Sequence, residues 1–443
     1  MLRKKIGLFL ACMTMFCAAT ACGENTETPD TDTSTSTGGE IVDTSKLGTV
    51  DTLVENFWET DTMYDETVLM VAETDAAGNV ISLPKAKLLF APEEILSVKQ
   101  YYHIDNDDVV TFAENVDFTV EDGYIIAKGD IRENMITEKY EFIGSMPYVT
   151  DKALTGEGQF PSIPQSTTIP STDAGLYLPF TESYQIVQMQ LSVTYKHAEN
   201  VWTGAVPIYH GETLSKTVAK LKAKEEVNVF VYGDSISTGA NSSGHLNIRP
   251  YLPSFPSLIC ENLSRYYGAT VKLTNKSVGG FTSSQGVNGG LGWVNGVQVA
   301  LPGLSQIFSE ELANYSPDLA IIGFGMNDAT LGVSINEYCN NIMSMIATIR
   351  ARNPECDIIL VGTMLANPKA LNQAKNQTEF SSYLSRVANQ YEGVAVVDVG
   401  LLHQDILDAG KHFTEISSNN VNHPNDFMTR VYAMHLLTAL IEK

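Results

Sequence analysis

The sequence predicts a C-terminal α/β domain with a parallel sheet, preceded by an all-β domain of the sandwich or jelly-roll type. From about residue 226, apolar strands alternate with helical stretches, which is the pattern of a parallel sheet with helices on both faces. Between residues 48 and 215, apolar residues instead follow the two-residue period of short strands. A length of 443 residues accommodates both domains, each with its own core.

The C-terminal domain, residues 226–443, is expected to alternate strands with helices along its whole length. The strands are predicted at residues 227–232, 270–274, 318–324, 357–363 and 394–398. The helices are predicted near residues 254–267, 298–314, 335–352, 376–391 and 425–442. This alternation brings the carboxyl ends of the strands to one edge of the sheet, where ligands bind in open α/β folds.

The all-β domain, residues 48–215, shows its period most clearly in one long segment. Apolar and polar residues alternate over Val187–Tyr195, which predicts a half-buried antiparallel strand. A shorter alternation over Val116–Val120 ends at the turn signal Asp122-Gly123. Several prolines within residues 160–180 predict a loop or an edge strand there.

The N-terminus resembles a bacterial lipoprotein signal. Basic residues precede an apolar run from Ile6 to about Ala18, which is too short to span a bilayer stably. The next segment, Ala19-Thr20-Ala21-Cys22, looks like a lipoprotein cleavage box, although Ala19 replaces the usual leucine. We therefore expect a signal peptide over residues 1–21 and a lipid anchor on Cys22. The alternative is ordinary secretion with Cys22 unmodified.

Composition indicates a surface protein rather than a nucleic-acid binder. Residues 22–47 are rich in Thr, Ser, Asp, Glu and Gly, which predicts a flexible linker above the membrane and a location at the bacterial cell surface. The 52 acidic and 28 basic residues give a net charge of -24. Because phosphate binding needs a basic face, this charge argues against nucleic acid as a partner.

The cysteines and the short motifs indicate no cofactor. Beyond Cys22 the mature chain has an odd number of cysteines without paired spacing, so neither a disulfide framework nor a C-x-x-C metal site is predicted. These cysteines, expected to be small buried residues, are Cys260, Cys339 and Cys356. No H-E-x-x-H metal motif, phosphate loop or dinucleotide fingerprint occurs in the sequence.

Four short motifs with polar side chains lie after predicted strands or before the last predicted helix. These positions bring them to the carboxyl edge of the predicted sheet. Gly233-Asp234-Ser235-Ile236 follows the first strand, and Asn275-Lys276-Ser277-Val278-Gly279-Gly280 follows the second. Gly325-Met326-Asn327-Asp328 follows the third strand. Asn420-Val421-Asn422-His423-Pro424 precedes the last helix. Each motif is weak alone, but together they supply a hydroxyl, amide donors and an imidazole at one edge.

These motifs resemble the SGNH hydrolases, also called GDSL-type esterases, over about residues 226–443. The resemblance implies a flavodoxin-like three-layer α/β/α domain and a serine esterase mechanism. It implies that Ser235 is the nucleophile and gives one backbone N–H to the oxyanion. Gly280 would give a second N–H, and Asn327 a third through its side chain. His423 would be the general base.

The chemistry of ester hydrolysis favours the same residue types independently. Attack on an ester places negative charge on the carbonyl oxygen, and each fixed N–H aimed at that oxygen stabilises it by roughly 2.7–4 kcal/mol. Histidine titrates near neutral pH, so it can accept the serine proton and return it to the leaving alcohol.

One departure from the family concerns the residue that orients His423. The family usually has an aspartate three residues before the histidine, where this chain has Asn420. Three candidates for this role stay open: Asn420, a backbone carbonyl, and Asp426 in the first turn of the last helix, where an aspartate also suits the helix dipole. His412 is the alternative base. Trp293, in a glycine-rich stretch, either lines a sugar site or only packs.

The predicted function is a secreted, lipid-anchored serine esterase that works through an acyl-enzyme on Ser235. By family analogy, the substrate is an acyl ester, acetyl in the first place, on a polysaccharide or a small molecule. Two alternatives remain. One is a lipase or thioesterase of the same fold, and the other is a catalytically inactive glycan-binding surface lipoprotein.

Overall fold

The computed structural model describes residues 54–103, 108–129, 142–143, 146–161, 163, 168–294, 296–373, 375 and 377–442. The predicted signal peptide (1–21), the lipid anchor at Cys22 and the linker (22–47) lie outside these residues and stay predictions. Among the described residues, no helix is both long enough and apolar enough to cross a bilayer.

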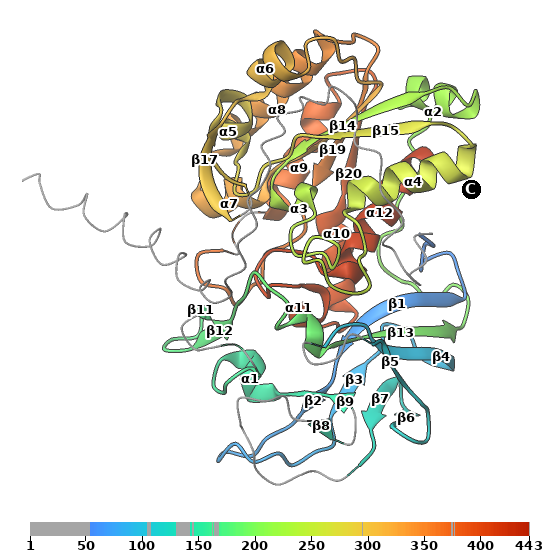
Figure 1. Ribbon diagram of the computed structural model, residues 1–443, viewed down its shortest axis with the longest axis vertical. Coiled ribbons are helices and arrows are strands. Elements are labelled where there is room, and N and C mark those ends of the chain that lie inside the picture. Colours follow the sequence, from blue (N-terminus) through green and yellow to red (C-terminus); the bar gives the residue numbers. More distant parts are fainter. Residues whose placement is uncertain are drawn as a thin grey trace, which may run out of the picture. The chain divides into compact units, whose positions relative to one another are not determined.

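Five parallel strands form the sheet of the C-terminal domain (Figure 1). They are β14 (Val227–Gly233), β15 (Val271–Asn275), β18 (Leu319–Gly323), β19 (Asp357–Gly362) and β20 (Val394–Asp398). Their order across the sheet is β15-β14-β18-β19-β20, so the chain builds outward from β14 in one direction and then in the other. In a doubly wound sheet the ligand site lies where this direction reverses, at the carboxyl ends of β14 and β18.

Long helices cover both faces of this sheet, which confirms the three-layer α/β/α prediction (Figure 1). The alternation of side chains along a strand decides which face each residue serves. Val229 and Val231 of β14 join one core, and Phe230 and Tyr232 join the other. The first core includes α4 (Phe255–Tyr267), α10 (Val399–Asp408) and α12 (Asp426–Leu440). The second includes α8 (Ile335–Arg350) and α9 (Gln377–Ala388).

Short helices complete the C-terminal domain, and several of them begin just after a strand. They are α2 (Ser215–Lys222), α3 (Ser235–Thr238), α5 (Ser283–Asn288), α7 (Met326–Leu331) and α11 (Phe413–Ile416). Since α3 follows β14 and α7 follows β18, both begin at the edge where the strand order reverses.

One predicted helix, residues 298–314, is wrong. The stretch begins in a hairpin of β16 (Gly290–Val294) and β17 (Val297–Leu301), then forms α6 (Leu304–Gln306) and the π-helical turn η4 (Ile307–Glu311). Pro302 and Gly303 interrupt helical geometry between these parts. A Cβ atom at Gly303 would lie 2.2 Å from the Val287 carbonyl oxygen, so only glycine fits there. The sequence prediction also missed α10.

The N-terminal region is rich in strands, most of them antiparallel, in two sheets ordered β1-β13-β4-β5 and β10-β2-β3-β7-β6. The first sheet consists of β1 (Thr62–Leu69), β4 (Pro92–Gln100), β5 (Val110–Phe112) and β13 (Gln190–His197). The second consists of β2 (Val71–Ala72), β3 (Lys85–Lys87), β6 (Phe118–Glu121), β7 (Tyr124–Ala127) and β10 (Val149–Thr150). Both sheets contribute side chains to one core, as the predicted sandwich requires.

Smaller elements connect the sheets and correct two predicted boundaries. They are β8 (Phe142–Ile143), β9 (Met146–Pro147), α1 (Asp151–Thr155), β11 (Thr168–Pro170), β12 (Tyr177–Pro179) and the 3₁₀ turn η3 (Val187–Met189). The strand expected from Val187 begins only at Gln190, because the preceding residues form that turn. Val116 is 71% exposed and lies in a turn before β6 rather than in a strand.

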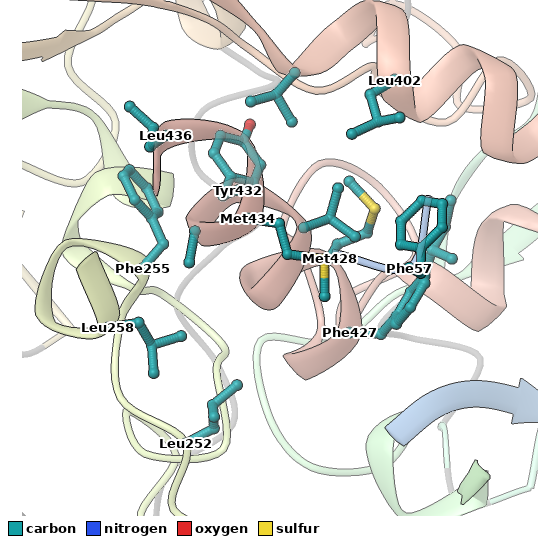
Figure 2. Close-up of a cluster of buried hydrophobic side chains, with 14 of the residues drawn as sticks. Phe57, Leu252, Phe255, Leu258, Leu402, Phe427, Met428, Tyr432, Met434 and Leu436 are labelled. Carbon is teal, nitrogen blue, oxygen red and sulfur yellow. The ribbon is translucent and has the colours of Figure 1, made fainter. Parts of the chain in front are cut away.

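The strand-rich region and the α/β domain share one hydrophobic core. Figure 2 shows Phe57 beside Phe427 and Met428 of α12, and the Phe57 and Phe427 ring centroids are 6.4 Å apart. A buried ion pair also joins the two regions, since Lys411 Nζ lies 2.8 Å from Glu66 Oε1 of β1. All residues described between 54 and 442 belong to one compact unit, so the boundaries at 48–215 and 226–443 stay predictions.

Candidate active site

Ser235 lies where β14 ends and α3 begins. Asp234 is the N-cap of α3, and its carboxylate accepts a hydrogen bond from the Ile236 N–H at 3.0 Å. The turn requires glycine at position 233, because a Cβ atom there would lie 2.4 Å from the Gly323 carbonyl oxygen and from Ser237 Oγ. This tight turn places the Ser235 hydroxyl at the carboxyl edge of the sheet, with 8% of the residue exposed.

His423 is held by the loop that precedes α12. Asn419 is completely buried, and its Oδ1 accepts hydrogen bonds from the backbone N–H groups of Val421, Asn422 and His423, each at 3.0 Å. Ser417 Oγ donates to the His423 carbonyl oxygen at 2.9 Å. These bonds fix the loop backbone, and so they fix the direction of the imidazole.

The structure brings Ser235 and His423 together. Ser235 Oγ lies 2.9 Å from His423 Nε2, although the two residues are 188 positions apart in the sequence. This is hydrogen-bond distance for a base that takes a proton from a serine nucleophile.

The other ring nitrogen of His423 meets two residues that the sequence prediction missed. Nδ1 lies 2.6 Å from Asn241 Oδ1 and 3.1 Å from Glu182 Oε2. Asn241 follows α3 in a left-handed conformation (φ 63°), which asparagine adopts more readily than most residues. Glu182 comes from the strand-rich region, just after β12. The only sequence hint was an Asn-Ser-Ser-Gly turn beginning at Asn241, and for Glu182 there was none.

Asn420, one of the residues suggested for orienting His423, has other partners. Its Oδ1 accepts hydrogen bonds from Thr414 Oγ1 at 2.9 Å and Asn367 Nδ2 at 3.1 Å. Its Nδ2 donates to the Pro179 carbonyl oxygen at 3.0 Å. The left-handed backbone at Asn420 (φ 63°) directs the side chain toward β12 rather than toward the imidazole.

Asp426, the other suggested residue, also serves a different group. Its Oδ1 accepts a hydrogen bond from the Ser243 N–H at 2.9 Å. Burial raises the pKa of Asp426, although Ser243 and Arg430 oppose that shift. The sequence-based suggestion is therefore corrected for both residues: Asn241 and Glu182 take the place beside Nδ1.

One predicted oxyanion donor, Gly280, lies in a turn beside the nucleophile, and another, Asn327, bonds to the residue after that turn. A Cβ atom built on Gly279 would be 4.0 Å from Ser235 Cβ, so the turn at Gly279 and Gly280 is beside the serine. Gly280 has φ 79°, a conformation that glycine adopts without strain. Asn327 Nδ2 donates to the Phe281 carbonyl oxygen at 2.9 Å. Because an amide nitrogen carries two protons, Asn327 keeps one N–H for a substrate oxygen.

Three titratable groups near the site, His423, Asp234 and Asp328, have displaced pKa values. Burial disfavours the imidazolium, but the charge and hydrogen bond of Glu182, together with Asp234, outweigh it and raise the pKa of His423. Burial raises the pKa of Asp234 to about 7, with the Ile236 hydrogen bond and His423 acting in the opposite direction. Burial likewise raises the pKa of Asp328 to about 6, opposed by its bonds to Ser283.

The remaining sequence candidates lie elsewhere or beside the site. His412 caps α11, and its Nδ1 accepts from the Thr414 N–H at 3.2 Å, so it is not the base at Ser235. Trp293 pairs with Gly279 through its backbone N–H, and the residue is 40% exposed.

Cys260, Cys339 and Cys356 are free, and the first and third are buried. Among the described residues, no group of three or more His, Cys, Asp or Glu converges as a metal site.

Comparison with known proteins agrees with this geometry. Residues 231–430 match the model of the GDSL-like lipase/acylhydrolase family. The matched segment contains Ser235, Gly280, Asn327 and His423. The family is named for hydrolases of acyl esters, and the match is limited to the α/β part of the chain. Among curated proteins, the comparison finds no match to this chain.

Solved structures with a partial likeness to this chain include esterases. A two-domain esterase (CEX) active on acetylated mannans is 19% identical, with a TM-score of 0.39 over 53% of this chain and 54% of that chain. The chain thus matches about half the length of that esterase. A variant of Axe2, an acetyl-xylooligosaccharide esterase from Geobacillus Stearmophilus, is 16% identical over 49% of this chain and 95% of that chain (TM-score 0.37). A lipolytic G-D-S-L protein from Veillonella parvula is 15% identical over 48% and 96% (TM-score 0.36).

Proposed function

We propose that Ser235 attacks the carbonyl carbon of an acyl ester and forms an acyl-enzyme. The observation that carries this proposal is the 2.9 Å distance between Ser235 Oγ and His423 Nε2. His423 takes the hydroxyl proton as the new C–O bond forms, and the carbonyl π electrons move onto the oxygen. That oxygen is stabilised by the N–H groups of Ser235 and Gly280 and by Asn327 Nδ2.

Collapse of the first tetrahedral intermediate completes the acyl-enzyme, which water then hydrolyses. His423 gives its proton to the leaving alcohol as the tetrahedral intermediate collapses, which leaves the acyl group on Ser235. A water molecule next gives a proton to His423 and attacks the acyl carbon. Collapse of the second intermediate releases the carboxylic acid and returns the proton to Ser235 Oγ, so His423 carries the proton in every step.

The proposed substrate is an acetyl ester on a carbohydrate, met at the cell surface by a protein anchored through Cys22. Trp293 supports a sugar ligand. A Cβ atom at Gly280 would lie 3.0 Å from Trp293 Cδ1, and this partly exposed indole offers a flat apolar face next to the oxyanion donors. The sequence of residues 1–22 supports export and lipidation.

A second candidate, a hydrolase of longer acyl esters, is favoured by the surface of the β16–β17 hairpin. This hairpin pairs with Gly279 and exposes apolar side chains on both of its faces. They are Leu291, Trp293, Val294, Val297 and Val299, exposed at 55%, 40%, 43%, 60% and 36%.

The test is hydrolysis of p-nitrophenyl esters of increasing chain length by the purified protein. Wild type should release p-nitrophenol from the acetate, and Ser235→Ala should abolish release while keeping the thermal melting curve. Equal inactivity of both proteins would show that the proposed catalysis is wrong and would favour a glycan-binding role. A preference for acetate supports the carbohydrate esterase, whereas a preference for octanoate supports the second candidate.

A further inference from the structure

We propose that Asn241 and Glu182 divide between them the task of the missing aspartate. Asn241 accepts the hydrogen bond from His423 Nδ1–H, and Glu182 supplies the negative charge that stabilises the imidazolium. This inference rests on the proposed esterase function. Asn241 and Glu182 are positioning residues, since they act on the substrate only through His423.

The geometry separates the two roles. Asn241 Oδ1 makes the shorter contact with Nδ1, at 2.6 Å, and Asn241 is 3% exposed. A proton held on Nδ1 by this acceptor leaves Nε2 free to accept the Ser235 proton. An amide is neutral, however, and adds no charge to balance the imidazolium. Glu182 Oε2 lies 3.1 Å from the same nitrogen and adds that charge.

Asn419 and Asn420 in the histidine loop hold the segment that carries Glu182. Asn419 Nδ2 donates to Glu182 Oε1 at 3.3 Å. Asn420 Nδ2 donates to the carbonyl oxygen of Pro179, three residues before Glu182. The residue at the usual aspartate position therefore fastens the segment that carries the substitute carboxylate.

A separate contact holds the loop that carries Asn241. Asp426 Oδ1 accepts from the Ser243 N–H, and Ser243 Oγ accepts from the Leu252 N–H at 2.8 Å. Asp426 thus supports the Asn241 loop without contacting the imidazole.

Other titratable groups near His423 do not replace Glu182. Asp234 is 1% exposed and its pKa is raised to about 7, so it carries its charge only partly at neutral pH. His245 interacts with both His423 and Glu182, and burial, the largest cause, lowers its pKa. The Glu182 side chain is 47% exposed, so water stabilises its charge while it remains in contact with Nδ1.

Two single substitutions test the two roles in the full-length protein. Glu182→Gln should lower kcat by about 10- to 50-fold with little change in KM, less than the ~10⁴-fold loss for a buried triad aspartate, because solvent screens a half-exposed charge. It should also move the acidic limb of the kcat/KM profile to lower pH. Asn241→Ala should lower kcat on the order of 10-fold and leave that limb in place, because the charge remains.

A double substitution provides the rescue. Glu182→Gln combined with Asn241→Asp places acceptor and charge on one residue, and aspartate tolerates the left-handed backbone at this position. This variant should recover kcat to within about threefold of wild type. Glu199→Gln, which removes an exposed carboxylate of the same strand-rich region, is the matched control and should leave kcat and the pH profile unchanged.

An NMR titration of His423 separates this proposal from the esterase function. The pKa of His423 should fall in Glu182→Gln and stay unchanged in Glu199→Gln, whether or not the ester is hydrolysed. An unchanged His423 titration, or a Glu182→Gln kcat within about twofold of wild type, would overturn the role of Glu182. Loss of Ser235-dependent turnover in wild type would instead overturn the proposed function alone.

Discussion

Lys411 offers a test of how the strand-rich region is fastened to the α/β domain. Its ammonium lies 2.8 Å from Glu66 Oε1 of β1, 3.3 Å from Glu415 Oε1 and 2.9 Å from the Thr67 carbonyl oxygen. The Lys411 and Glu66 side chains are 1% and 0% exposed. Burial opposes the charge on Lys411, but Glu415 and Glu66 outweigh it and raise its pKa.

Replacing Lys411 with methionine keeps the apolar stem and removes the charge. Two buried carboxylates then lose their cation, which typically costs about 3–5 kcal/mol. Glu66 keeps its bond from Tyr195 Oη at 2.6 Å, and Glu415 keeps its bond from the His412 N–H at 2.7 Å, so the loss should stay within this range. With an unfolding entropy of ~2.1 cal/mol/K per residue over roughly 390 residues, Tm should fall by about 4–6 °C.

The loss of stability in Lys411→Met relative to wild type should grow as the pH rises. Without Lys411, one of the two carboxyl groups should hold a proton in the folded state at neutral pH, whereas an unfolded glutamate loses it near pH 4.3. The folded variant then binds more protons than the unfolded chain. The contribution of this carboxyl group to stability is therefore greatest below about pH 4.3 and declines above it, by up to ~1.4 kcal/mol per pH unit relative to wild type.

Urea unfolding followed by circular dichroism at pH 5 and pH 8 measures both effects. Lys85→Met is the matched control, because the Lys85 and Glu73 pair is 43% and 54% exposed and should contribute less than about 1 kcal/mol. A Lys411→Met loss below about 1 kcal/mol, or a deficit that shrinks from pH 5 to pH 8, would refute the reasoning.

Three further predictions concern the site. Asn327→Ala removes the side-chain oxyanion donor. In steady-state kinetics it should lower kcat on the order of 10²- to 10³-fold with little change in KM. A loss of kcat below about tenfold would contradict the role of Asn327 as a donor. Asn420→Asp should not restore a family-like triad, because the side chain faces Pro179 and Thr414. We expect a lower kcat, and urea unfolding should show about 1–3 kcal/mol less stability. A raised kcat would contradict this prediction. Since neutral His423 is the active form and Glu182 and Asp234 raise its pKa, kcat/KM should rise with pH through a midpoint above 6.5; a midpoint well below that value would exclude the raised pKa.

The sequence by itself determined the parts of the site that depend on local structure. Ser235 and Asn327 each follow an apolar strand, and parallel strands present their carboxyl ends at one edge. The five strand positions were predicted to within two residues at either end, because apolar runs bounded by glycine or polar residues mark them directly. Residues 298–314 were mistaken for a helix because short apolar runs fit both helix and strand periods.

Only the tertiary structure decided what holds His423. The sequence marks Asn420 by its position three residues before the histidine, yet a left-handed backbone directs that side chain to Pro179. Asn241 and Glu182 reach the imidazole from a loop after α3 and from the strand-rich region. Contacts of this kind depend on loop conformation and on how distant segments pack, and neither leaves a periodic trace along the chain.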